Sequence, residues 1–99
     1  MQNLPKNMFT DSLRVKINCE ITFIRETDRS EPDLAAISYE SIQNPLKRAW
    51  ITTYQHKRNG ITIDCELYDS TNNTANVIKV VNTHNIKEII SELYDWLID

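Results

Sequence analysis

The pair Asn59-Gly60 lies between two runs of β-forming residues and constrains the fold of this chain more than any other feature. Asn-Gly is the preferred pair for a two-residue type I′ turn, whose twist matches the strands that it joins. A hairpin closed by this turn pairs Tyr54 with Cys65. Its predicted core side is apolar and holds Trp50, Tyr54, Ile61, Ile63, Cys65 and Leu67. Its opposite side is mostly polar and holds Ile51, Thr53, Gln55, Lys57, Thr62, Asp64, Glu66 and Tyr68.

A strict alternation of apolar and polar residues runs from Leu13 to Phe23. A period of two is typical of a half-buried strand with one apolar and one wet face. The sequence therefore predicts a first strand over residues 13–23, with residues 1–12 as a loosely ordered lead-in. The apolar side of this predicted strand consists of Leu13, Val15, Ile17, Cys19, Ile21 and Phe23.

Residues 31–43 fit two structures. Ser30 with Pro32 and Asp33 after it is typical of a helix start, and apolar residues then follow helical spacing as far as Asn44-Pro45. Alternation of Ile37 with Tyr39 leaves a strand as the alternative. We predict a short helix here.

The C-terminal part predicts a strand over roughly 75–82 and then an amphipathic helix. Asn85 with Glu88 three positions later forms a capping pair at the helix start. The apolar stripe of the predicted helix consists of Ile86, Ile89, Ile90, Leu93, Tyr94 and Leu97.

Together these elements predict one α+β domain over residues 1–99. It has a small antiparallel sheet of about four strands, a short helix between the first two, and the C-terminal helix packed on one face.

Several classes of site are excluded by residue usage. Gly60 is the only glycine, and loops that cradle phosphates need several. Cys19 and Cys65 lie far apart, and the chain has no C-x-x-C or H-x-x-x-H spacing, so no metal and no cofactor is expected. The N-terminal residues lack a continuous apolar stretch, and no run reaches the ~18 apolar residues of a membrane span. We therefore expect a cytoplasmic protein with free thiols and no membrane contact.

Catalytic groups are sparse. In the predicted hairpin His56 lies diagonal to Cys65, the best available pair of nucleophile and base. A nucleophilic cysteine needs an accessible, electropositive setting, and Cys65 is predicted at mid-sheet among apolar residues. Asp64 and Glu66 share the polar side but have no supporting motif. The sequence predicts that this is not an enzyme.

Charge is unevenly distributed along the chain. Residues 1–60 carry nine basic and seven acidic side chains, residues 61–99 carry two and seven, and the net charge is −3. After residue 30 the predicted element order is similar to that of double-stranded-RNA-binding domains. However, the last helix opens Asn85-Ile86-Lys87-Glu88 and lacks the lysine cluster that phosphate contacts need. Direct nucleic-acid binding is therefore the weakest alternative.

The remaining hypothesis is protein binding. We predict an inhibitor or an immunity- or antitoxin-type protein that masks a basic surface of a partner, such as a nucleic-acid-binding protein. The alternative is a structural subunit that pairs with itself through an exposed sheet edge or through the Ile51–Tyr68 face, as a homodimer rather than a monomer. The predicted contact residues are the acidic helix, an aromatic and aliphatic pair near the C-terminus, and a pair on the polar side of the hairpin: Glu88, Glu92, Asp95, Asp99, Trp96, Ile98, Ile51 and Tyr68.

Overall fold

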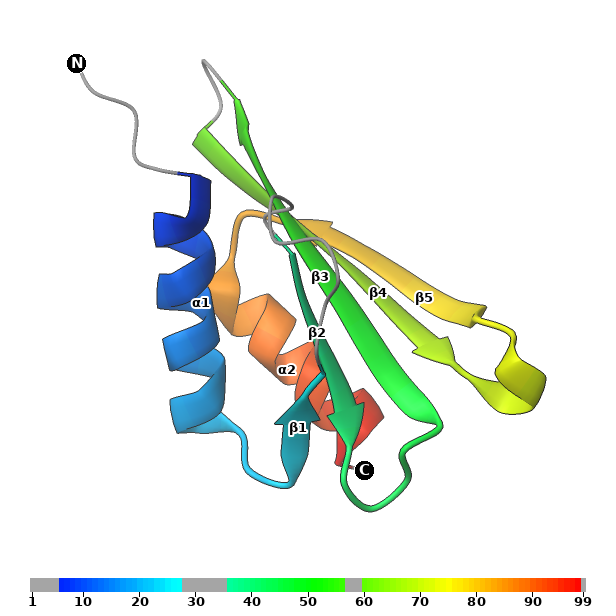
Figure 1. The fold of residues 1–99 in the computed structure, drawn as a ribbon. Coiled ribbons are helices and arrows are strands. Elements are labelled where there is room, and N and C mark those ends of the chain that lie inside the picture. Colours follow the sequence, from blue (N-terminus) through cyan, green and yellow to red (C-terminus); the bar gives the residue numbers. More distant parts are fainter. Residues whose placement is uncertain (1–5, 28–35, 57–59, 99) are drawn as a thin grey trace.

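The computed structural model describes residues 6–27, 36–56 and 60–98. A helix is followed by five strands and a second helix, with a 3₁₀ turn at Thr71–Asn73 between the last two strands. The elements are α1 (Lys6–Glu20), β1 (Ile24–Glu26), β2 (Ala36–Ser41), β3 (Lys47–His56), β4 (Gly60–Asp69), β5 (Asn76–Thr83) and α2 (Ile86–Leu97). The strands form one antiparallel sheet in the order β1-β2-β3-β4-β5 (Figure 1). The α+β class and the packing of α2 on the sheet are confirmed, with five strands rather than four.

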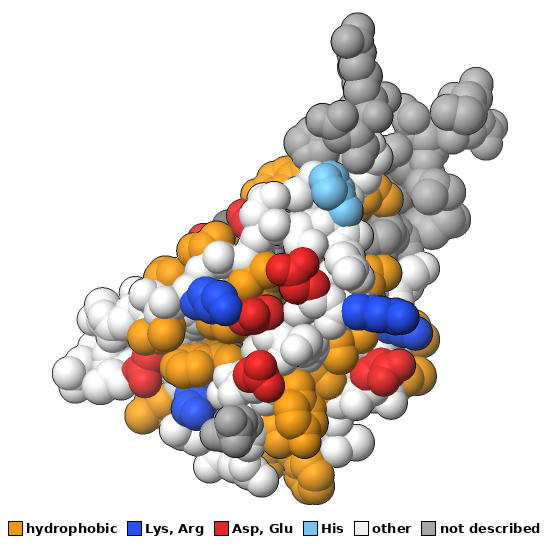
Figure 2. All heavy atoms as spheres, turned by 180° about the vertical axis from the view of Figure 1, so that it is seen from behind, with side chains coloured by type: hydrophobic (Ala, Val, Ile, Leu, Met, Phe, Trp, Pro, Cys, Tyr) orange, Lys and Arg blue, Asp and Glu red, His pale blue; other side chains and the backbone are white. Residues whose placement is uncertain are grey.

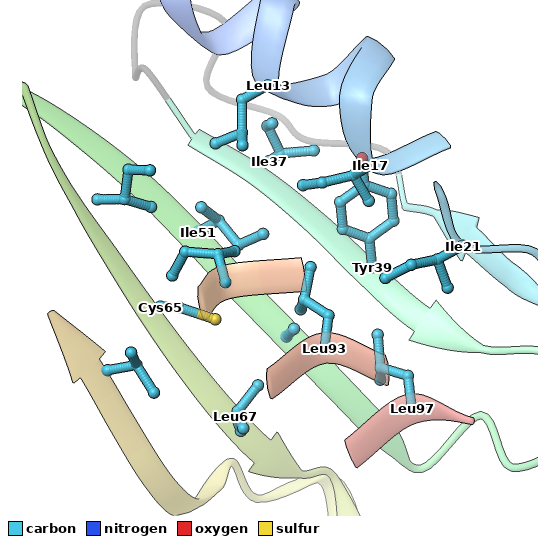
Figure 3. Packing of buried hydrophobic residues seen from close by; sticks show 14 residues of the cluster. Leu13, Ile17, Ile21, Ile37, Tyr39, Ile51, Cys65, Leu67, Leu93 and Leu97 are labelled. Atoms are coloured by element: carbon cyan, nitrogen blue, oxygen red, sulfur yellow. The ribbon is translucent and has the colours of Figure 1, made fainter. Parts of the chain in front are cut away.

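The core lies between the two helices and one face of the sheet (Figure 3). Leu13 and Ile17 of α1 point toward Ile37 and Tyr39 of β2, and Leu93 of α2 points into the same cluster. All five side chains are fully buried. Because both helices contribute to one cluster, they cover the same face, which we call the helix side.

The other face of the sheet carries no helix in the described part of the chain. Over β3, β4 and β5 we call it the open face. Strand alternation and the observed pairing place Trp50, Thr52, Tyr54, Thr62, Asp64, Glu66, Tyr68, Val77 and Val80 on it.

The predicted first strand over residues 13–23 is wrong, because most of it belongs to α1. Leu13, Ile17 and Ile21 are buried, whereas Val15 is 61% and Phe23 59% exposed. A spacing of four residues satisfies both a period of two and the 3.6-residue helical period, so the three buried residues fit either structure. Residues 6–12 of the predicted lead-in are helical, and residues 1–5 lie outside the described residues.

The predicted short helix over residues 31–43 is also wrong. Residues 36–41 form β2, and the predicted helix start at Ser30 lies outside the described residues. β2 pairs with β1 on one side and β3 on the other, and all six of its residues are buried. Pairing on both sides provides ladder hydrogen bonds that a weak helical pattern does not outweigh.

The hairpin is confirmed, but its register differs from the prediction. His56 pairs with Gly60 and Ile51 pairs with Cys65, so residues 57–59 join the strands. Asn59 of the predicted turn lies outside the described residues, and Gly60 has φ +74°. Of the four residues predicted on the core side of β4, Ile63, Cys65 and Leu67 are buried as expected and Ile61 is half-buried.

On β3 the predicted faces are exchanged. Ala49 and Ile51 are in the core, while Trp50 and Tyr54 lie on the open face. The loop is one residue longer than a two-residue turn. A change of parity in the register moves every side chain of one strand to its other face.

The last strand and helix are confirmed close to their predicted bounds. Asn85 caps α2, since its Oδ1 accepts a hydrogen bond from the Lys87 N–H at 3.0 Å. The Glu88 carboxylate accepts a hydrogen bond from the Thr83 hydroxyl at 2.7 Å instead of closing the cap. Tyr94, predicted in the apolar stripe, is 52% exposed and does not belong to the core.

Candidate interaction surfaces

The acidic side chains predicted to bind a partner lie on the outer side of α2. Figure 2 shows acidic side chains at the middle of the helix side with Lys or Arg side chains to either side. Glu92 forms an ion pair with Lys79 of β5 at 2.9 Å, and its hydrogen bond to the Lys79 ammonium holds the pKa of Lys79 above its ordinary value. Glu88 is held by Thr83, Asp95 is exposed, and Asp99 lies outside the described residues. A lysine thus neutralises part of this acidic surface.

Trp96 and Ile98, predicted to contact a partner, make contacts within the fold. The Trp96 Nε1 donates a hydrogen bond to the Arg48 carbonyl at 2.9 Å, and the Lys47 ammonium lies 4.9 Å from the centre of the indole ring. Ile98 packs against the core cluster. These contacts attach the end of α2 to the start of β3.

The predicted Ile51–Tyr68 surface is wrong, because the two residues lie on opposite faces of the sheet. Ile51 pairs with Cys65 and is fully buried on the helix side. Tyr68 pairs with Arg48 and Val77 on the open face, where it is half-buried. Only Tyr68 is placed to meet a partner.

Tyr68 lines a shallow hollow on the open face with a volume of about 250 Å³. The register explains its shape, because Trp50 is directly opposite Glu66 on the neighbouring strand, and Val77 is opposite Tyr68. The hollow is lined by Trp50, Glu66, Tyr68, Ala75 and Val77. It therefore combines two aromatic rings and aliphatic walls with one carboxylate.

Glu66 and Asp64, two positions apart on β4, are both half-buried on the open face. Among the described residues, no ion pair joins either carboxylate to a cation. Aromatic faces and a carboxylate both attract a cationic side chain. The sequence does not reveal this hollow, because the predicted register places Trp50 on the core side.

A row of charged residues lies on the same side of the sheet over β1, β2 and β3. Glu40 of β2 stands directly opposite Arg25 of β1 and Arg48 of β3. Its side chain is 4% exposed and is ion-paired with both arginines, with 3.4 Å between Oε2 and Nη2 of Arg48. These arginines satisfy a buried carboxylate, so they do not form a free basic patch.

The structure separates the catalytic pair considered from the sequence. Cys65 pairs with Ile51, whereas His56 pairs with Gly60 at the loop end of the hairpin. Cys65 is fully buried, and burial raises the pKa of its thiol to about 12. The other histidine, His84, donates a hydrogen bond from Nδ1 to the Ile61 carbonyl at 2.9 Å.

Among residues 6–27, 36–56 and 60–98, no three His, Cys, Asp or Glu side chains form a group that would hold a metal ion. In the same part of the chain no helix is long and apolar enough to cross a membrane. Both cysteines are unpaired, Cys19 exposed and Cys65 buried.

Comparison of the chain with protein-family models, with curated proteins and with solved structures finds no match.

Proposed function

We propose that this chain is a protein-binding module of the inhibitor, immunity or antitoxin type, and that it holds a basic segment of its partner on the open face. The observation that supports this is the hollow, which is lined by the aromatic residues Trp50 and Tyr68 together with Glu66. In this proposal a lysine or arginine side chain of the partner enters the hollow and pairs with Glu66. The chain acts by binding rather than by catalysis, in the cytoplasm.

The surroundings of the hollow suit a protein partner. A cation over an aromatic ring contributes about 0.5–2 kcal/mol, more as water is excluded. Val77 and Val80, 52% and 55% exposed, border the hollow and provide apolar area that excludes water. Asp64 extends the negative charge along β4. Trp and Tyr are the residue types that dominate binding energy at interfaces.

As the binding surface, the open face is favoured over the acidic side of α2 because its carboxylates are not paired with described cations. Glu92 is already paired with Lys79, and Trp96 is fixed to β3, so fewer groups of the helix are available to a partner. In contrast, no described cation pairs with Glu66 or Asp64. A basic partner gains more from the unpaired carboxylates.

The test uses two Glu→Lys variants as baits beside the wild type. Glu66→Lys (E66K) reverses the charge inside the hollow, and Glu88→Lys (E88K) makes the same change on α2. Each bait is incubated with nuclease-treated lysate of the source cells, and the retained protein is purified and titrated against all three. We expect one stoichiometric partner that E88K binds like the wild type and E66K binds at least about tenfold more weakly, with an affinity that falls as salt rises.

The opposite outcomes are equally specific. Loss of the partner with E88K alone would assign binding to the acidic helix. A partner that binds all three baits equally, or that disappears on nuclease treatment, would contradict the proposal, as would the absence of any retained protein.

A further inference from the structure

β5 is the long edge of the sheet, and its outer side is unpaired in the described part of the chain (Figure 1). It is eight residues long, whereas β1 at the other edge has three. Val77, Ile78 and Val80 of β5 are each more than half exposed. An exposed, apolar edge strand presents N–H and C=O groups that pair readily with another strand.

The usual protections against edge pairing are weak on β5. The strand reads Asn-Val-Ile-Lys-Val-Val-Asn-Thr, without proline and with one charged residue, Lys79. Lys79 points to the helix side, where Glu92 of α2 holds its ammonium at 2.9 Å. A register irregularity between β4 and β5 falls at Ile78, so residues 79–83 continue in regular pairing. The C-terminal half of this edge is therefore both regular and nearly uncharged.

We propose that β5 pairs with β5 of a second copy of this chain, antiparallel and around a two-fold axis, to form a continuous ten-stranded sheet. This inference rests on the edge strand and is independent of the proposed function, which rests on the open face. With a two-fold axis perpendicular to the sheet, one residue of β5 lies directly opposite the same residue of the second copy. The same symmetry keeps all four helices of the dimer on one side of the sheet.

Charge selects the register. If the two-fold axis passed between the two copies of Lys79, two ammonium groups would lie directly opposite each other, which destabilises a strand pair. A centre at Val80 places two valines opposite each other on the open face and Lys79 opposite Val81 of the second copy. Lys79 is then diagonal both to Lys79 of the second copy and to Thr83 of the second copy, whose hydroxyl holds the carboxylate of Glu88. Diagonal positions are about 7–8 Å apart, within reach of a lysine side chain.

In this register each Lys79, already paired with Glu92 of its own chain, lies near Glu88 of the other copy, and this attraction opposes the repulsion between the two diagonal lysines. A second copy is thus a better occupant of this edge than an arbitrary strand, since the charge pattern of β5 and α2 is complementary to itself. A single strand pair is at the small end of protein interfaces, so we expect a dissociation constant on the order of 10–100 µM.

Sedimentation of the full chain tests this directly. As the concentration rises from about 5 to about 500 µM, spanning that constant, the mass should rise from 11.6 kDa toward twice that value. Val80→Lys (V80K) places two lysines at the centre of the interface and should weaken dimerisation at least about tenfold. Val15→Lys is the matched control, because Val15 is 61% exposed on α1, and it should dimerise like the wild type.

A disulfide test checks the register without placing a charge in the strand. In a background with Cys19→Ser, Val80→Cys (V80C) should cross-link two copies under mild oxidation, since directly opposite residues have Cα atoms about 4.5–5.5 Å apart, within the range of about 4.4–6.8 Å that a disulfide spans. Val15→Cys in the same background should form no cross-link, although it dimerises through β5 like the wild type, and Cys65 is buried.

Three results would overturn the inference. The first is a monomer at every concentration without cross-linking of V80C. The second is a dimer that V80K leaves intact, which would place the contact elsewhere. The third is a monomer whose protein partner is retained by E66K and lost on V80K, which would show that the edge receives a strand of another protein.

Discussion

Glu40 is a buried charged residue on β2, a strand that is paired on both sides. Its neighbours on β1 and β3 are arginines, each directly opposite; Arg25 donates a hydrogen bond to its carboxylate and Arg48 forms an ion pair with it. A carboxylate taken out of water is stable only when charged donors replace the lost hydration. The row from Arg25 through Glu40 to Arg48 therefore joins the short strand β1 to the rest of the sheet.

Replacing Glu40 with Gln (E40Q) should lower the free energy of unfolding by about 1–2 kcal/mol. The amide keeps the shape but removes the charge between two guanidinium groups, which are themselves partly exposed and so limit the loss. Urea denaturation measures the effect. Glu20→Gln is the control, because Glu20 pairs with Lys16 at 3.6 Å on the surface, and it should change stability by less than about 0.5 kcal/mol. Equal effects of the two changes would show that the row contributes nothing.

At the scale of elements, the helices and strands that the sequence predicts correctly are those with local sequence signals. Asn85 and the apolar stripe after it suffice for α2, and the β-forming runs suffice for β3, β4 and β5. The errors arise where two periods agree or where pairing decides. Leu13, Ile17 and Ile21 fit a strand as well as a helix.

The face of β3 could not be predicted, because it depends on whether the loop has two or three residues. For the same reason the candidate site could not be predicted. Tyr68 was expected to be available to a partner, but its neighbours in the hollow, Trp50 and Glu66, come together only in the observed register. Likewise, the pairing of Lys79 with Glu92 joins residues of two elements and has no signal in the sequence.

The attachment of α2 to the sheet gives a prediction for a whole element. Trp96→Phe (W96F) removes the hydrogen bond to the Arg48 carbonyl and part of the contact with Lys47. We expect a loss of about 1–2 kcal/mol in the free energy of unfolding, with faster hydrogen exchange in the last turn of α2. Tyr94→Phe, on the same helix but 52% exposed, should have little effect. Unchanged exchange in W96F would mean that the core contacts of Leu93 and Leu97 alone hold the helix.

At the scale of the whole molecule, one core unites both helices with the sheet, and two ionisable groups are buried in it. Burial raises the pKa of the Cys65 thiol to about 12 and also raises the pKa of the Tyr39 hydroxyl. The folded state therefore keeps protons that the unfolded chain releases at lower pH. Both groups contribute stability that is fully present below the pKa of the unfolded chain and is lost as the pH rises above it.

The fold as a whole should consequently lose stability at alkaline pH. An unfolded cysteine with the reference value of 9.0 would be mostly ionised at a pH of about 10.5, whereas folded Cys65 would not. With the smaller contribution of Tyr39, the free energy of unfolding should fall by about 2–3 kcal/mol between pH 8 and this pH. Urea denaturation at the two pH values measures the change. Cys65→Ala should lower stability at pH 8, since it leaves a cavity, yet reduce the alkaline loss to about 1 kcal/mol. An alkaline loss as large in this variant as in the wild type would show that the buried thiol is not its source.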